Sequence, residues 1–240
     1  MSRPNRFPLA LLTAVCALAA MVTGAYVTSV SAIRTPAAPA SETRAVQPPA
    51  PTERPPVVKV WKNVHRGLSS LSGLAALALA FLLGGPMRNW LIASVLLASI
   101  PGGLLDGRIA PGFSGLIHAV TASIMTSVCF VAALYTSAAW ASDAPDRILD
   151  EGSPSLATLA RVTWVALLVQ TALGALYRHQ VLGLLPHVGG ALLVMGLAMF
   201  AGIAAFSTAA APAAVKRPAL ILLILTGVQM LFGLGAYLYR

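Results

Sequence analysis

The stretch VHRGLSSLSGLAALALAFLL, residues 64–83, decides the fold class, because it is an apolar run that opens with a histidine and an arginine. About 20 apolar residues in a helix cross the roughly 30 Å hydrocarbon core of a bilayer. The whole chain has the same character, with 58% hydrophobic and 10% charged residues and a mean hydropathy of +0.81. Since a soluble domain carries about a quarter charged residues, the sequence indicates a membrane protein.

Similar apolar runs recur along the chain, and strand-like alternation is absent. A spanning segment must pair its own backbone polar groups, so helices are expected. The predicted fold is an all-α polytopic membrane protein with seven transmembrane helices. Pro101 in the short third segment predicts a kink near its end. The predicted helices are residues 7–30, 65–83, 90–105, 113–140, 156–177, 181–206 and 219–239.

Two loops divide the chain. Residues 33–63 are rich in proline and predict an extended outer linker. The acidic loop 142–155 separates a first bundle of helices 1–4 (residues 1–141) from an incomplete second bundle of helices 5–7 (residues 156–240). The first apolar run could belong to a signal peptide, but it exceeds the usual 7–15 residues of the hydrophobic region of such a peptide, so it is interpreted as a retained helix.

The two halves contain an internal repeat. MVTGAYVTSV (21–30) resembles TALGALYRHQ (171–180), with Gly24 matching Gly174, and Gln170-x-x-x-Gly174 recurs as Gln229-x-x-x-Gly233. Each even-numbered helix also carries a histidine near its start. Because duplicated halves build paired sites, the second half is expected to lack its last helix.

The charge pattern indicates a membrane partner. The net charge of +9 comes from residues scattered over loops, which fits anionic lipid head groups and not nucleic acid. Cys16 and Cys129 lie inside apolar runs, so disulfide chemistry is not expected. We expect the N-terminus inside a bacterial cytoplasmic membrane. The basic residues that assign the inner side are Arg3, Arg6, Arg88, Lys216 and Arg217.

With that orientation all four histidines, His65, His118, His179 and His187, lie near the outer surface. Any one of them could simply be an interfacial side chain. Matching positions on alternate helices instead favour a shared cofactor, and two imidazoles on opposite faces of a macrocycle ligate a b-type haem. Zinc and non-haem iron are less favoured, because no Asp or Glu lies inside a predicted helix.

The surroundings of the histidines agree with this interpretation. Arg66 and Arg178 adjoin His65 and His179, and a guanidinium suits haem propionates, although both arginines could also reach for lipid head groups. Small residues near the histidines leave room for a planar ring; these are Ser69, Gly73, Ala122, Gly189 and Gly190.

In order and spacing, the motifs GAYVTSV, VHRGLSSLSGL, LIHAVTAS, GALYRHQ and LPHVGGALL resemble the haem A synthase family of membrane oxidoreductases. The resemblance implies eight helices in two pseudo-symmetric four-helix bundles. It also implies oxidation of the methyl group of haem O to the formyl group of haem A for cytochrome oxidase. One bundle would hold a haem cofactor and the other the substrate haem.

Carried over by residue, the resemblance makes His65, His118 and His187 ligands of haem iron and places His179 in the family's Arg-His motif. Three departures are visible. Lys62 stands where the family has a glutamate, the outer linker lacks the family's cysteine pair, and the family's eighth helix is expected to be missing. The ligand pair of the first bundle, His65 and His118, is then complete, whereas the second bundle has only one ligand, His187.

Three functions remain open at this stage. The first is haem A synthase activity, with haem b as cofactor and haem O as substrate and with the catalytic residues unassigned. The second is a non-catalytic haem b-binding or electron-transfer protein, and the third is a membrane scaffold without haem. Expected partners besides the lipid bilayer are a haem O synthase, a chain that supplies an eighth helix, and a second copy of the chain.

Overall fold

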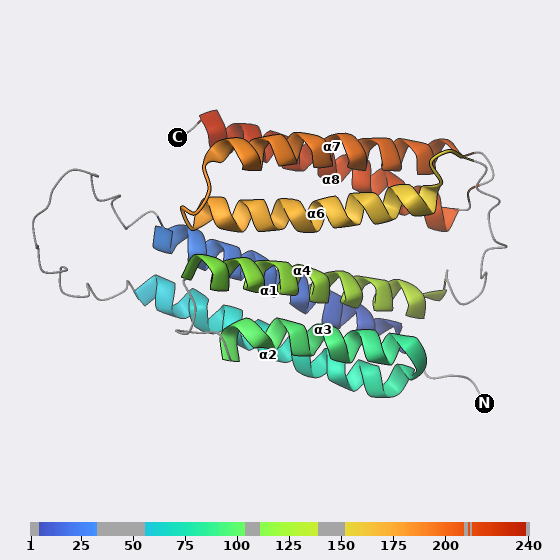
Figure 1. The fold of residues 1–240 in the computed structure, drawn as a ribbon. Helices are drawn as coiled ribbons and strands as arrows, with labels where there is room; N and C mark the ends of the chain where they lie inside the picture. The colour runs from blue at the N-terminus through green and yellow to red at the C-terminus, as the bar shows by residue number, and fades with distance from the viewer. Residues whose placement is uncertain are drawn as a thin grey trace, which may run out of the picture. The chain divides into compact units, whose positions relative to one another are not determined.

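The computed structural model describes residues 5–32, 56–103, 111–138, 152–208, 211 and 213–238, and this part of the chain is helical without any strand (Figure 1). The helices in chain order are α1 (Phe7–Ala32), α2 (Pro56–Leu83), α3 (Gly85–Gly103), α4 (Pro111–Thr136), α6 (Leu156–Arg178), α7 (Leu184–Ser207) and α8 (Ala213–Leu238). The predicted all-α class is confirmed.

Six of the described helices are long and apolar enough to span a membrane, which fits an integral membrane protein. The exception is α3, because Arg88 and Asn89 near its start and Pro101 near its end interrupt a short apolar run. Large apolar side chains face outward; Phe81 is 79% and Leu185 84% exposed. Of the seven predicted transmembrane segments, six therefore have the required length and composition.

The predicted start of the second helix at His65 is wrong, because α2 begins at Pro56. A proline suits the first helical position, where its missing N–H costs no hydrogen bond. Residues 56–63, assigned to the extended linker from the sequence, are therefore helical, and Lys62 lies on α2. The rest of that linker (33–55) and the acidic loop up to residue 151 lie outside the described residues.

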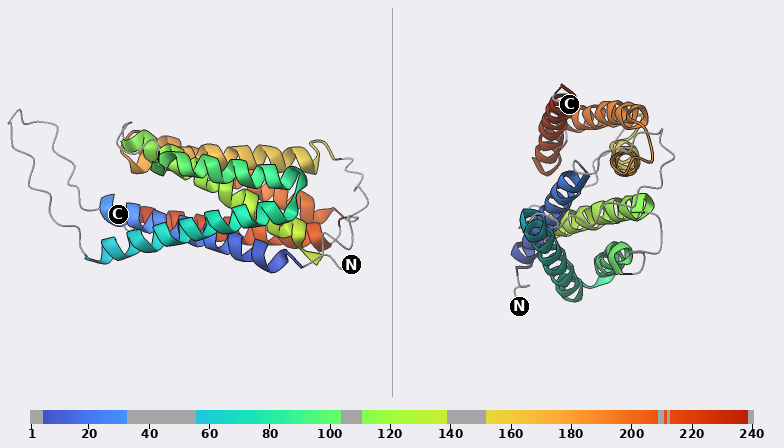
Figure 2. Two further views of the ribbon diagram at one scale, coloured as in Figure 1. Left: turned by 90° about the horizontal axis from the view of Figure 1, so that it is seen from below. Right: turned by 90° about the vertical axis from the view of Figure 1, so that its left-hand side faces the viewer.

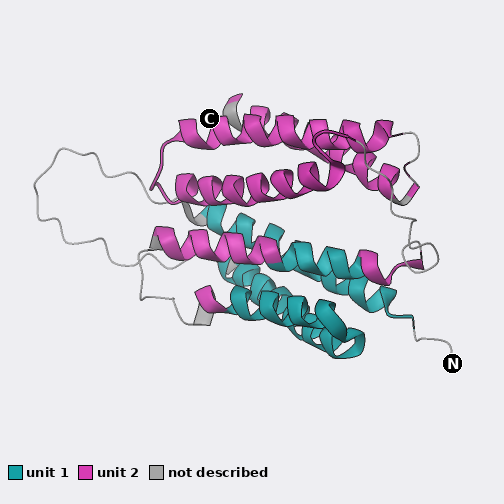
Figure 3. Ribbon diagram, turned by 45° about the vertical axis from the view of Figure 1, so that its right-hand side comes forward, with its two compact units in different colours: residues 1–99, 125–133 teal, residues 100–124, 134–240 magenta. Residues whose placement is uncertain are grey.

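The chain divides into two compact units, coloured separately in Figure 3. The first unit contains residues 1–99 and 125–133. Within it α1 and α2 run antiparallel and pack along each other (Figure 2). Small residues allow this close approach. Its core consists of Ala10, Ala14, Ala17, Ala76, Leu79, Ala80, Leu91, Met125, Cys129, Ala132 and Ala133.

The second unit contains residues 100–124 and 134–240. Helix α6 packs on α7, and α7 packs on α8. Helix α6 begins at a cap in which the Ser155 hydroxyl accepts a hydrogen bond from the Thr158 N–H, as expected for a serine at this position. Gly202 of α7 lies against Leu223 of α8, where a larger residue would not fit. The second unit thus contains a histidine-bearing helix pair of its own.

Candidate histidine sites on two helix pairs

In the first unit, His65 of α2 reaches across to the backbone of α1. Its Nδ1 lies 2.8 Å from the carbonyl oxygen of Ala20. A carbonyl oxygen can only accept a hydrogen bond, so Nδ1 carries the proton and donates it. In the neutral ring the lone pair is then on Nε2, the nitrogen that a metal ion would bind.

Gly24, one turn after Ala20 on α1, provides the space for this ring. A Cβ atom built on Gly24 would lie 2.8 Å from Cε1 and 3.0 Å from Nδ1 of His65. Any larger residue would displace the imidazole. On the same helix pair, Tyr26 and Trp61 pack edge to face, with ring centroids 5.3 Å apart. The histidine is therefore held by backbone geometry and by close packing together.

In the second unit, His187 of α7 meets α6 at the matching place but through a different group. The Nε2 of Gln170 lies 3.1 Å from Nδ1 of His187 and donates to the His187 backbone carbonyl at 3.0 Å. An amide NH₂ is a donor, so here Nδ1 accepts. In the neutral ring the proton is then on Nε2, the reverse of His65.

The packing around His187 repeats that around His65. A Cβ atom built on Gly174 would lie 3.1 Å from Cε1 of His187. The Tyr177 ring stacks on the His187 ring, with ring centroids 5.7 Å apart and ring planes 6° from parallel. Ala20 and Gly24 on α1 thus correspond to Gln170 and Gly174 on α6, so the repeat found in the sequence has a structural counterpart.

His179 is the C-cap residue of α6, and the hydrogen bonds that end the helix hold its backbone. The N–H of Val181 donates to the Leu176 carbonyl and that of Gln180 to the Tyr177 carbonyl, which is the Schellman pattern that ends helices. Gln180 takes the left-handed conformation that this motif needs, with φ 60°. The His179 ring lies directly against Gly115 of α4, within the second unit.

His118 lies one turn after Gly115 on α4 and is exposed, whereas His65, His179 and His187 are half-buried. It belongs to the second unit and His65 to the first, so the predicted pairing of these two histidines stays a prediction. Within the described residues, no three His, Cys, Asp or Glu side chains are grouped so as to hold a metal ion.

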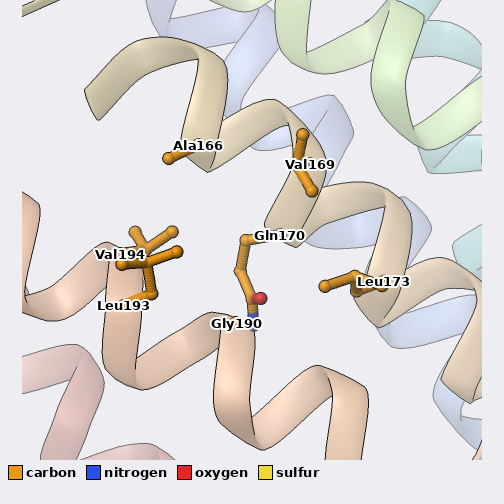
Figure 4. Close-up of a pocket in the computed structure, with 7 residues that line it drawn as sticks. All are labelled: Ala166, Val169, Gln170, Leu173, Gly190, Leu193 and Val194. Atoms are coloured by element: carbon orange, nitrogen blue, oxygen red, sulfur yellow. The ribbon is translucent and has the colours of Figure 1, made fainter. Parts of the chain in front are cut away.

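A pocket of about 160 Å³ lies between α6 and α7 (Figure 4). Its wall is apolar except for Gln170, whose Oε1 is buried and has no hydrogen-bond partner among the described residues. This oxygen and Leu173 lie against Gly190, where an added Cβ atom would not fit. The prediction that Gly190 leaves room for a planar ring stays a prediction. The other lining residues are Ala166, Val169, Leu193 and Val194.

Three cations flank the histidines on α2 and α6. Arg66 directly follows His65 and is exposed, and Lys62 is half-buried three residues before it, on the same side of α2. Arg178 is the last residue of α6 and is half-buried. The contact of Gln170 with His187 was not predicted from the sequence, where its only signal is an amide inside an apolar helix.

Comparisons with known protein families, with characterised proteins and with solved structures find no match to this chain. The resemblance to haem A synthase therefore rests on the five short motifs alone.

Proposed function

We propose that this chain is a haem-handling membrane protein of the haem A synthase type, whose α1–α2 pair binds a b-type haem through His65. One observation carries the proposal: the 2.8 Å hydrogen bond from Nδ1 of His65 to the Ala20 carbonyl. Histidines that ligate metals commonly donate their second ring N–H to a carbonyl or carboxylate, which fixes the tautomer and the direction of the ligating nitrogen.

The residues on α1 and α2 fit a haem in two further respects. A haem brings four ligands of its own, so the protein needs to supply only axial ligands, and a cluster of three protein ligands is not required. Lys62 and Arg66 place cations within one turn of His65, where they would bind propionates. When bound, the haem would supply one-electron chemistry at its iron, and the protein would orient and shield it.

The second axial ligand proposed from the sequence is His118. Since it belongs to the other unit, its role rests on its position at the start of α4 and on the motif LIHAVTAS. His187 is a weaker candidate, because its Nδ1 accepts the Gln170 hydrogen bond and its Nε2 then carries the proton. In this arrangement His187 presents a donor and not a lone pair.

The absorption spectrum of the protein purified from haem-replete cells tests haem binding. We expect a low-spin, six-coordinate b-type spectrum with one haem per chain. A colourless protein would contradict the proposal.

Oxidation of haem O to haem A is the second candidate function, and the ordered set of motifs favours it. Lys62 opposes it, because an ammonium in place of a carboxylate cannot accept a proton or stabilise a developing positive charge. We expect little or no haem A when the chain is expressed alone with a haem O synthase. Extraction and chromatography of total haem measure the product, and efficient conversion would establish the enzyme function.

The proposed location is a bacterial cytoplasmic membrane with the N-terminus inside. Membrane-impermeant thiol labelling in intact cells tests this orientation. A cysteine that replaces Ala45 should be labelled and one that replaces Ala144 should be protected; the opposite pattern would reverse the topology.

A further inference from the structure

Helix α8 carries one amide side chain inside an apolar span. Gln229 lies within the candidate membrane span Val215–Gly235, whose hydropathy is 2.0 and which is the least buried of the six spans. The residue is exposed, and no hydrogen bond from its side chain to another described residue is present. An amide without a partner in hydrocarbon costs several kcal/mol, so this side chain requires a partner in the membrane.

The surroundings of Gln229 form a distinct face of α8. Leu225, one turn before it, is 59% exposed, and Phe232, about one turn after it, is 70% exposed. Gly233, four residues on, has open space around its Cα. The helix contacts α7 through a different side, where Leu223 lies on Gly202. The face defined by Leu225, Gln229, Phe232 and Gly233 is hereafter the Gln229 face.

Helix α6 shows how the same motif holds a neighbouring helix in this protein. In Gln170-x-x-x-Gly174, the amide donates to a backbone carbonyl of α7, and the glycine lets a side chain of α7 lie against the helix. Gln229-x-x-x-Gly233 repeats that spacing on α8. Side-chain amides and small residues are the two features that drive association of helices in membranes.

We infer that the Gln229 face binds the α8 helix of a second copy of this chain. An amide is both a donor and an acceptor, so two Gln229 side chains related by a two-fold axis satisfy each other without any other polar group. Two-fold interfaces require such self-complementary surfaces. Gly233 allows the two backbones to approach, and Leu225 and Phe232 pack beside the amide pair. This inference is independent of haem binding.

Disulfide cross-linking in native membranes tests the geometry. In a background with Cys16→Ala and Cys129→Ala, Leu225→Cys should form a covalent dimer on mild oxidation. The matched control is Leu231→Cys, an exposed leucine on the opposite side of α8, which should stay monomeric. Equal cross-linking at both positions, or none at Leu225→Cys, would overturn the inference.

Dimer affinity in lipid bilayers tests the role of the amide. Fluorescence energy transfer between labelled copies, measured over a range of protein-to-lipid ratios, should show that Gln229→Leu weakens association by roughly 3- to 30-fold, the range typical of one interhelical side-chain hydrogen bond. Met230→Leu, a neighbouring apolar substitution, should leave association unchanged. A wild-type chain that is monomeric at every ratio, or a Gln229→Leu dimer as tight as the wild type, would contradict the proposal.

Discussion

The α1–α2 and α6–α7 pairs place a histidine in the same way and then differ in one partner. In each pair the ring lies against a glycine of the preceding helix, Gly24 or Gly174, and its Nδ1 meets the residue four positions before that glycine. The partner is the carbonyl of Ala20 in the first pair and the side chain of Gln170 in the second. A repeated scaffold thus holds one imidazole with its Nδ1 as a donor and the other with its Nδ1 as an acceptor.

The difference follows from the chemistry of the two partners. A backbone carbonyl can never donate, so the tautomer of His65 does not depend on which side chain stands at position 20. The tautomer of His187 depends entirely on the side chain at position 170. We therefore expect the first pair to bind haem robustly and the second pair to be adjustable by a single substitution.

The largest expected effect is the loss of an axial ligand. His65→Ala should abolish the b-type spectrum or convert it to a high-spin form, because the iron loses an imidazole, and His118→Ala should do the same if the ligand pair proposed from the sequence is correct. His187→Ala is the matched variant and should change the spectrum much less. Optical spectra of the three purified variants measure these changes. An equal loss of the low-spin spectrum in all three variants would show that the two helix pairs do not differ in haem ligation.

A smaller effect on haem affinity is expected from a substitution of Gly24, and Gly174 provides the comparison. A methyl group at position 24 would lie 2.8 Å from the His65 ring, whereas one at position 174 would lie 3.1 Å from the His187 ring. Overpacking of this kind costs about 1–3 kcal/mol, which is a loss of roughly fivefold or more in haem affinity for Gly24→Ala. Gly174→Ala should leave haem affinity unchanged. Haem titration of the apo-proteins measures both, and the reverse order would indicate that haem binds on α6–α7.

Gln170→Glu should change the tautomer of His187 on α6–α7 without affecting that of His65 on α1–α2. A carboxylate can only accept a hydrogen bond from Nδ1 of His187, whereas the amide donates one. The ring proton should therefore move from Nε2 to Nδ1, which is the tautomer of His65. Nitrogen NMR of histidine-labelled protein distinguishes the two forms, with Gln170→Leu as a control that removes the amide and adds no acceptor. The inference about Gln170 is wrong if the His187 tautomer is the same in wild type and Gln170→Glu.

The smallest effect is the change in haem A formation that we expect from Lys62→Glu. This substitution restores the carboxylate of the haem A synthase pattern one turn before His65, but it leaves the second pair unchanged. We expect at most a slight rise in haem A when the variant is expressed with a haem O synthase, measured by chromatography of extracted haem. Full conversion by this single variant would show that residue 62 alone had limited the chemistry.

The helical fold was largely predictable, because the length and hydrophobicity of a run are properties of the sequence alone. One prediction about the helices failed for a physical reason. The start of α2 at Pro56 was missed because residues 56–63 mix lysines with apolar residues and do not resemble a membrane-spanning run. The third predicted span, on α3, stays a prediction, because α3 is not among the six described helices with the length and composition of a membrane span.

The candidate site was predictable only in part. The sequence identified the histidines and the glycine repeat, but not the partner of each ring. The Gln170–His187 contact joins residues 17 positions apart and depends on the register between two helices. The Ala20–His65 bond uses a backbone carbonyl, which every residue has and no sequence pattern marks.

Chemical rescue tests most directly the claim that His65 is a haem ligand and His187 is not. His65→Gly and His187→Gly would be purified and their spectra recorded before and after addition of imidazole. We predict that His65→Gly loses the low-spin b-type spectrum and regains it with imidazole, which replaces the missing side chain at the iron. His187→Gly should keep the spectrum in both conditions. A low-spin spectrum in His65→Gly without imidazole, or one in His187→Gly that requires it, would contradict this account.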